Sequence, residues 1–117
     1  MNAHKTIDLG QLSTGQLRAK RQRLARRVLD LNVVLSGSLV TQVRRCGKAG
    51  CRCVAGDPHG PYTYLSSGVD GAVRLRYVPK DLVEVVTRRL TATAALHALL
   101  AEISAINTEL LARRELD

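Results

Sequence analysis

The chain has 117 residues and a formal net charge of +8, from 18 Lys and Arg against 10 Asp and Glu. Hydrophobic residues make up 45% and charged residues 24%, proportions that exclude wholesale disorder, and the length suits one domain. Aromatic residues are only 3%, all of them Tyr, so the core must use Leu, Val, Ile and Ala, which favours a mainly helical α+β fold.

Residues 1–12 show no clear periodicity and predict a flexible tail, without the apolar stretch of a signal peptide. No apolar run approaches the roughly 20 residues that are needed to cross a bilayer. These features predict a soluble, cytoplasmic protein that makes no membrane contact.

A basic amphipathic helix is predicted over residues 13–36. Ser13 or Thr14 can cap its start, and Gly37 can end it. Seam positions recur at alternating spacings of four and three, a narrow stripe typical of an amphipathic helix. They hold Leu17, Arg21, Leu24, Val28, Leu31 and Leu35, of which only Arg21 is polar.

Residues 38–79 are predicted to hold a cysteine knuckle and a small antiparallel β-hairpin. Residues 38–45 are rich in β-branched side chains and suit a short strand that leads into the cysteines. Residues 61–67 and 72–78 suit two more strands joined at Asp70-Gly71, because Gly tolerates the positive φ of a two-residue turn. Period two then places one group of side chains on a face expected to pack on the helices, namely Tyr62, Tyr64, Val73, Leu75 and Tyr77, and Arg74 and Arg76 on the other face.

All three cysteines fall within residues 46–53, and a histidine follows six residues later, in the pattern C-x4-C-x-C-x5-H. Three thiolates and one imidazole form a tetrahedral donor set for Zn²⁺, and residues 46–61 have little else to bury. We predict a structural zinc knuckle with Cys46, Cys51, Cys53 and His59 as ligands. His97 or a residue from a second chain are the alternatives for the fourth ligand, and reduced, buried thiols are the alternative to zinc.

A long helix is predicted over residues 80–115, with Pro79 before it and Asp81 and Glu84 near its positive end. Eight of nine seam positions between residues 82 and 110 are apolar, with Arg89 the exception. At ~1.5 Å per residue the helix would exceed ~45 Å, which is longer than one small core covers. We therefore expect residues 82–110 to pair with the first helix, or to form a homodimer or join a larger complex.

Basic residues are concentrated in residues 14–53, which carry ten Lys and Arg and one acidic residue. Residues 54–117 carry seven Lys and Arg and eight Asp and Glu. Such asymmetry favours contact with a polyanion, of which nucleic acid is the commonest in a cell, and an Arg-rich solvated surface is the alternative. The cations expected to contact nucleic acid are Arg18, Lys20, Arg21, Arg23, Arg26, Arg27, Arg44, Arg45, Lys48, Arg52, Arg74 and Arg76.

The sequence RRCGKAGCRCVAGDPHGPYTYLSS, continued by GAVRLRYVPKDL, resembles a family of short, uncharacterised prokaryotic proteins. Its members share a cysteine knuckle, a strand of the His-Gly-Pro-Tyr-Tyr type and a long terminal helix, and Thr63 between Tyr62 and Tyr64 is a mild departure. The resemblance covers roughly residues 38–110. It implies a metal site and an association with plasmids, phages and transposable elements, and it implies no substrate.

Carboxylates are sparse and scattered, and the sequence has no phosphate-binding glycine loop and no H-E-x-x-H pair, so we expect no enzyme. The expected function is a small zinc-stabilised nucleic-acid-binding protein, with DNA favoured over RNA, that regulates or assists a mobile element. The alternative is a coiled-coil adaptor whose zinc knuckle is purely structural and whose basic half binds an acidic protein.

Overall fold

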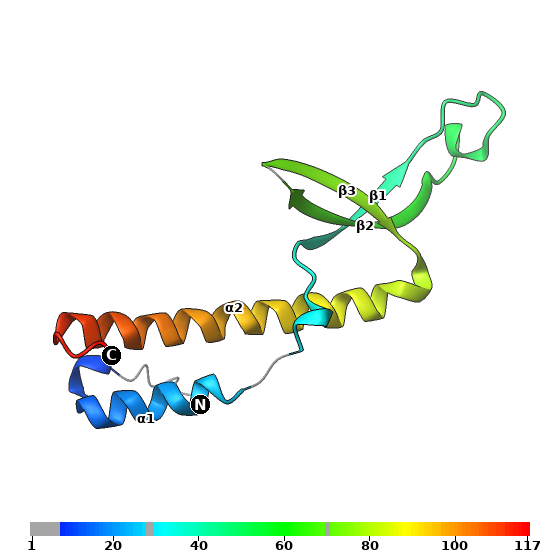
Figure 1. Ribbon diagram of the computed structural model, residues 1–117. Coiled ribbons are helices and arrows are strands. Elements are labelled where there is room, and N and C mark those ends of the chain that lie inside the picture. Colours follow the sequence, from blue (N-terminus) through cyan, green and yellow to red (C-terminus); the bar gives the residue numbers. More distant parts are fainter. Residues whose placement is uncertain (1–7, 28–29, 70) are drawn as a thin grey trace, which may run out of the picture. The chain divides into compact units, whose positions relative to one another are not determined.

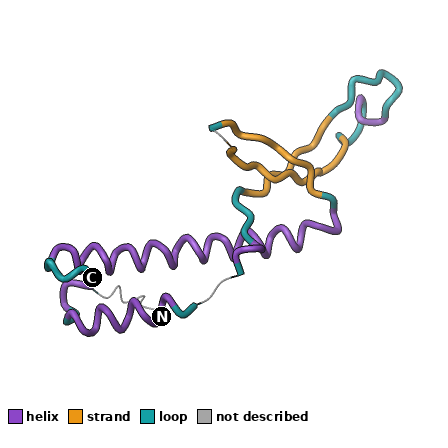
Figure 2. Tube along the Cα trace, viewed as in Figure 1, coloured by secondary structure: helices purple, strands orange, loops and turns teal. Residues whose placement is uncertain are grey.

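The computed structural model describes residues 8–27, 30–69 and 71–117 (Figure 1). Helices α1 (Thr14–Ala25) and α2 (Val83–Ala112) flank three strands along the chain, with short 3-10 turns between the elements. The strands are β1 (Ser38–Arg44), β2 (His59–Val69) and β3 (Ala72–Val78), as Figure 2 shows. The predicted fold class, a short helix, a small antiparallel sheet and a long C-terminal helix, is confirmed.

The chain divides into two compact units, where a single domain over residues 13–117 was expected. One unit combines Met1–Leu31 with Ala95–Asp117 and is helical; the other is Asn32–Ala94 and contains the sheet. Helix α2 contributes its first part to the sheet unit and the remainder to the helical unit.

The helical unit is held together by α1 and the second half of α2. A capping box starts α1: Ser13 Oγ accepts the Gln16 N–H at 3.1 Å, and Gln16 Oε1 accepts the Ser13 N–H at 2.9 Å. Leu9 and Leu12 pack on the core, so residues 8–12 of the predicted tail belong to this unit, while residues 1–7 lie outside the described residues. The core consists of Leu17, Leu24, Leu99, Ile106 and Leu110.

The predicted basic helix is shorter than expected. It ends at Ala25 rather than near Leu35, and Leu31–Val33 form a separate 3-10 turn in which Leu31 is exposed. Asp30 and the residues that follow it, Asn32 and two consecutive valines among them, are weak helix formers, and this local preference outweighs the apolar spacing. Val28, another predicted seam residue, lies outside the described residues.

The three strands form one antiparallel sheet in the order β1-β2-β3. The predicted hairpin register is confirmed, since Tyr64 pairs with Tyr77 and Val69 with Ala72. Gly71 has a φ of 79°, the positive value that the turn requires, while Asp70 lies outside the described residues. The predicted strand before the cysteines is also confirmed as β1.

The prediction that the tyrosine-bearing side of the sheet packs on the helices is wrong. Leu65 and Val78, on the opposite side, are buried, whereas Tyr77 is 52% exposed. The segment before β1 covers the buried side: a Cβ at Gly37 would lie 3.1 Å from Leu65 Cδ1. Arg74 and Arg76 share this side nearer the hairpin turn and are exposed, as predicted.

Replacing Gly37 with Ala is expected to destabilise the sheet unit. Gly37 has a φ of 134°, and a Cβ there would come within 2.5 Å of the Ser66 carbonyl oxygen. Backbone strain of this kind costs about 1–3 kcal/mol, before the clash is added. Thermal unfolding followed by circular dichroism measures the loss. The control is Gly68→Ala in β2, where the nearest neighbour lies 3.9 Å away; equal stability of the two variants would contradict the prediction.

The helical segment Lys80–Ala112, which is α2 with the turn before it, is long and apolar enough to cross a membrane, by length and composition only. The mean hydropathy of its most apolar stretch is 1.3. This corrects the expectation that no apolar run comes close to that length. A single such helix is weak evidence for a span, because core helices of soluble proteins pass the same test. Leu99, Ile106 and Leu110 of α2 pack against α1, but only 17% of the most apolar window of the helix is buried.

Candidate metal centre

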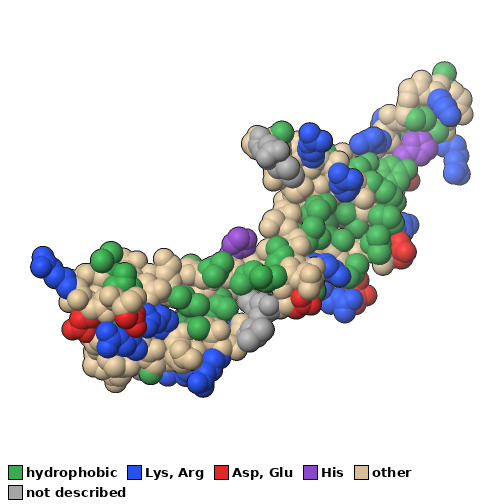
Figure 3. Space-filling view, viewed as in Figure 1, with side chains coloured by type: hydrophobic (Ala, Val, Ile, Leu, Met, Phe, Trp, Pro, Cys, Tyr) green, Lys and Arg blue, Asp and Glu red, His purple; other side chains and the backbone are tan. Residues whose placement is uncertain are grey.

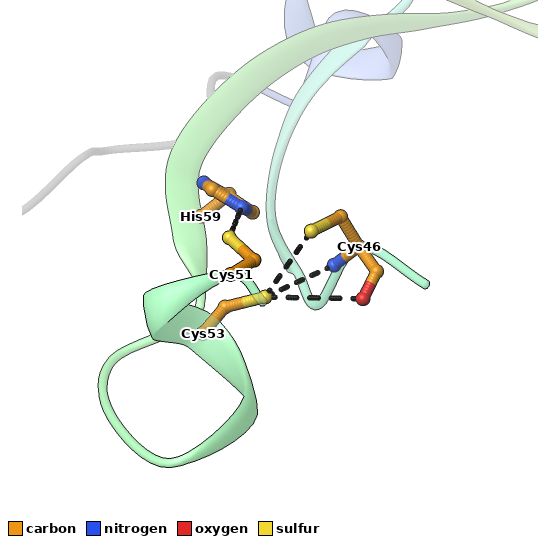
Figure 4. A group of neighbouring side chains, drawn as sticks. All are labelled: Cys46, Cys51, Cys53 and His59. Carbon is orange, nitrogen blue, oxygen red and sulfur yellow. Dashed lines mark hydrogen bonds between the residues drawn. The ribbon is translucent and has the colours of Figure 1, made fainter. Parts of the chain in front are cut away.

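Four metal-binding side chains meet where β1 ends and β2 begins (Figure 4). Cys46 follows β1, Cys51 and Cys53 flank the start of the 3-10 turn Arg52–Val54, and His59 is the first residue of β2. Arg44 pairs with His59 in the antiparallel register, so the strand pair brings both ends of the intervening loop together. We call residues 45–59 the knuckle.

The donor atoms are spaced as a tetrahedral ion requires. All four lie within 4.8 Å of one another. Cys46 Sγ is 3.4 Å from Cys53 Sγ, and Cys51 Sγ is 3.0 Å from His59 Nε2. Zinc–sulfur bonds of about 2.3 Å place thiolate sulfurs about 3.8 Å apart, so shifts of about an ångström or less would seat an ion. Cys46, Cys51, Cys53 and His59, the predicted set, lie close enough together to hold a metal ion.

The pKa values of Cys51 and Cys53 are shifted in opposite directions. The backbone N–H of Cys53, followed by the side chains of Cys46 and Cys53, lowers the pKa of Cys51 to about 6, so its thiolate is already favoured at neutral pH. Burial raises the pKa of Cys53, whose side chain is among the most buried in the protein. A metal ion binds thiolates and would displace the remaining protons.

Backbone and arginine contacts hold the knuckle in shape. The Cys51 N–H donates to the Lys48 carbonyl at 3.1 Å, and the Val54 N–H donates to the Cys51 carbonyl at 3.1 Å. The Arg45 guanidinium donates to the Cys53 carbonyl and, at 3.0 Å, to the Gly56 carbonyl. Arg45 was predicted to contact nucleic acid, but these bonds direct its guanidinium into the knuckle.

Gly60 lets β2 continue directly from His59, the last residue of the cluster. Its φ is 109°, and a Cβ there would lie 2.9 Å from the Tyr62 nitrogen and 3.0 Å from the Gln42 carbonyl oxygen. A side chain at this position is therefore excluded by β1 as well as by the backbone conformation. His59 itself is exposed, whereas Cys46 and Cys51 are half-buried, so the cluster is open to solvent on one side.

A family model described as "Domain of unknown function (DUF6788)" matches residues 14–88. The chain belongs to the DUF6788 family. The matched residues contain α1, the whole sheet, all four metal-binding side chains and the first residues of α2. The expected membership of an uncharacterised family is thus confirmed at the level of the family. No curated protein and no solved structure matches the chain.

Two arginines of the predicted basic helix bond to residues near the C-terminus of the same chain. Arg21 forms an ion pair with Asp117 at 2.8 Å and also donates to Asn107 Oδ1 at 2.9 Å. The hydrogen bonds that Asp117 accepts from Arg21 lower the pKa of its carboxyl to about 2. Arg18 donates to the Glu115 carbonyl at 3.0 Å. Lys20 is half-buried. Arg18 is exposed although it makes this bond, and Arg23, Arg26 and Arg27 are exposed too.

The sheet unit of the DUF6788 domain carries the remaining predicted cations. Lys48 and Arg52 are exposed on the knuckle, and the guanidinium carbon of Arg44 lies 5.3 Å from the centre of the Tyr64 ring. Arg74 and Arg76 are exposed on β3. The predicted cations therefore belong to two units: the α1 set is in the helical unit and the other set in the sheet unit.

One structural arginine was missed by the sequence reasoning. Arg113 forms an ion pair with Glu109 at 3.1 Å and donates to the carbonyls of Leu9 and Gly10 at 3.2 and 3.3 Å. It therefore ties the end of α2 to the segment before α1. The sequence did offer a signal for the ion pair, because Glu109 and Arg113 are four residues apart, or about one helical turn.

Proposed function

We propose that this DUF6788 protein is a small zinc-stabilised protein that binds nucleic acid, with DNA favoured over RNA. The observation that carries the proposal is the convergence of Cys46, Cys51, Cys53 and His59, which can hold a metal ion at the base of a cationic loop. Three thiolates and an imidazole select zinc over harder ions such as magnesium and calcium.

A structural role for the ion follows from the donor set. Four protein ligands complete a tetrahedral zinc site and leave no position for a water or a substrate. The knuckle has few apolar side chains to bury, and Val54 is exposed, so the ion would supply the free energy that orders it. We therefore propose a binding protein rather than an enzyme, acting in the reducing cytoplasm.

Charge supports nucleic acid as the partner. The sheet unit, residues 32–94, has nine basic and four acidic residues, a net charge of +5. On the knuckle, Lys48 and Arg52 are exposed, and α1 and the residues after it expose Arg23, Arg26 and Arg27. Long, exposed cations of this kind contact phosphates and give salt-dependent binding with modest sequence specificity. The resemblance to proteins of plasmids, phages and transposable elements supports a regulator or accessory factor of a mobile element.

Neutralising the exposed cations after and within α1 tests the proposal. The triple variant Arg23→Gln, Arg26→Gln and Arg27→Gln is expected to weaken binding to duplex DNA at least about tenfold. If all three contact phosphates, the slope of log K against log salt concentration should fall by about 3. Fluorescence anisotropy at several salt concentrations measures both values.

The control is a second triple variant, Lys80→Gln, Arg88→Gln and Arg114→Gln, which removes the same charge from exposed positions outside the proposed set. It should retain most of the affinity. Equal loss in both variants would show attraction by net charge alone, and failure of the unmodified protein to bind duplex or single-stranded nucleic acid would refute the proposal.

A second candidate function, a coiled-coil adaptor, is favoured by the exposed apolar side of α2. Leu100 and Leu111 are 54% and 59% exposed and line a shallow groove of about 390 Å³ together with Ile103 and Leu116. A second copy of the chain or a larger complex would cover this side. Mass measurement in solution separates the candidates: a stable dimer that retains no nucleic acid would favour the adaptor.

A further inference from the structure

The uncovered side of the sheet collects every aromatic side chain of the protein. Tyr62, Tyr64 and Tyr77 are the three aromatic residues, and the strand register places them on one side together with Leu75 and Val73. We call these five residues the tyrosine face. Tyr77, Leu75 and Val73 are exposed, and Tyr62 and Tyr64 are half-buried. Figure 3 shows hydrophobic side chains gathered over the sheet.

The rings of the tyrosine face are not stacked on one another. Tyr77 meets Tyr62 with ring centres 6.3 Å apart and planes at 74°, and it meets Tyr64 at 5.9 Å and 67°. Edge-to-face contacts hold the rings in place and do not cover both faces of each ring. A flat partner can therefore stack on an aromatic surface that the sheet has already ordered.

Cations border the tyrosine face at its knuckle end. Arg44 lies 5.3 Å from the centre of the Tyr64 ring, and it pairs with His59, the last residue of the knuckle. The exposed Lys48 and Arg52 belong to the same loop, whose one acidic residue is Asp57. A partner that covers the tyrosine face and also contacts these cations must carry negative charge. An uncharged apolar partner would form no ion pair with them.

We propose that the tyrosine face binds unpaired nucleotides, with bases stacked on the tyrosine rings and phosphates at Arg44 and the knuckle cations. This inference rests on the proposed nucleic-acid function and specifies its substrate class as single-stranded nucleic acid. Aromatic rings beside a basic track suit single strands because each unpaired base offers a flat face, whereas bases in a duplex are already stacked. Single-stranded DNA and RNA share this chemistry.

Binding of short labelled oligothymidylate and oligouridylate, about 12 nucleotides long, tests the inference in the full-length, zinc-loaded protein. The variant Tyr77→Leu keeps an apolar side chain and removes the flat ring; it is expected to weaken binding of the single strand about 5- to 150-fold. Tyr77→Phe should restore it. Duplex DNA of equal length should bind Tyr77→Leu as it binds the unmodified protein, and the ratio between the two oligonucleotides ranks DNA against RNA.

Intrinsic fluorescence gives an independent readout of the same site. The protein has three tyrosines and no Trp, so its emission comes from the tyrosine face alone. Stacked bases should quench this emission as the oligonucleotide binds, and Tyr77→Leu should show less quenching. Zinc content and circular dichroism equal to those of the unmodified protein establish that the variant is folded.

The outcomes separate this inference from the proposed function. Unchanged single-strand affinity in Tyr77→Leu, with duplex binding intact, would overturn the tyrosine-face inference and leave the proposed function standing. Failure of the unmodified protein to bind any nucleic acid would overturn both. Loss of self-association in Tyr77→Leu, without loss of single-strand binding, would assign the face to a second copy of the chain and overturn the inference.

Discussion

Removal of the metal ion is expected to unfold the knuckle while the core between α1 and α2 stays folded. The four donor atoms belong to the sheet unit, whereas the core leucines belong to the helical unit. Structural zinc contributes about 10 kcal/mol or more to small sites, a free energy that the exposed side chains of the knuckle cannot replace. Elemental analysis should find one zinc per chain before chelation, and hydrogen exchange should then show loss of protection confined to the sheet unit.

The variant Cys53→Ser should reproduce the effect of chelation. Cys53 is 1% exposed, and its Sγ lies 3.4 Å from Cys46 Sγ. The substitution replaces a thiolate ligand with a hydroxyl at a position that is closed to solvent. His59→Cys should keep the metal, because zinc accepts four cysteines. His97→Gln is the control, since His97 is outside the cluster. Full zinc occupancy in Cys53→Ser, or a protein that never contains metal, would contradict the zinc centre.

Truncation of Leu110 to Ala is expected to destabilise the helical unit by about 2–5 kcal/mol. Leu110 is fully buried among Leu17, Leu24, Leu99 and Ile106, and the cavity left behind adds to the lost transfer free energy. A natural domain is stable by about 5–15 kcal/mol, so this one change removes a large share of the total. Urea denaturation followed by circular dichroism measures the difference.

The matched control for Leu110 is the next residue. Leu111 is 59% exposed, and Leu111→Ala should change the stability by less than about 0.5 kcal/mol. A comparable loss in both variants would mean that Leu111 is buried in solution. That result would support an oligomer formed through α2 and would contradict the exposed position of Leu111 in the monomer.

Local signals in the sequence were enough to predict the strands, the hairpin register and the cluster of side chains that can hold a metal ion. The Asp70-Gly71 pair in the sequence was enough to predict the register of the two strands, and the spacing of three cysteines and His59 was enough to predict the cluster. The long helix was predictable because its apolar period persists over many turns. Each of these features depends on residues that are close in sequence.

The features that the sequence did not predict depend on competing local signals or on partners that only the fold brings together. The end of α1 at Ala25 reflects competition between a periodic stripe and weak helix formers, which spacing alone does not weigh. The choice of buried sheet side depends on the segment at Gly37, which lies against Leu65 and Ser66. Arg21 and Arg45 likewise look like free cations in the sequence, and only the fold reveals their partners Asp117 and Cys53.

The position of the metal-binding side chains has a consequence for strand pairing. Cys46 lies just after β1 and His59 begins β2, so an ion bound by both closes the connection between these strands much as a tight turn closes a hairpin. A slip of one residue between strands would turn every side chain of β1 to the other side of the sheet. A bound ion would therefore fix the register of the two strands, with Val40 opposite Tyr64 and Gln42 opposite Tyr62. Metal supply would then decide which side chains border the tyrosines.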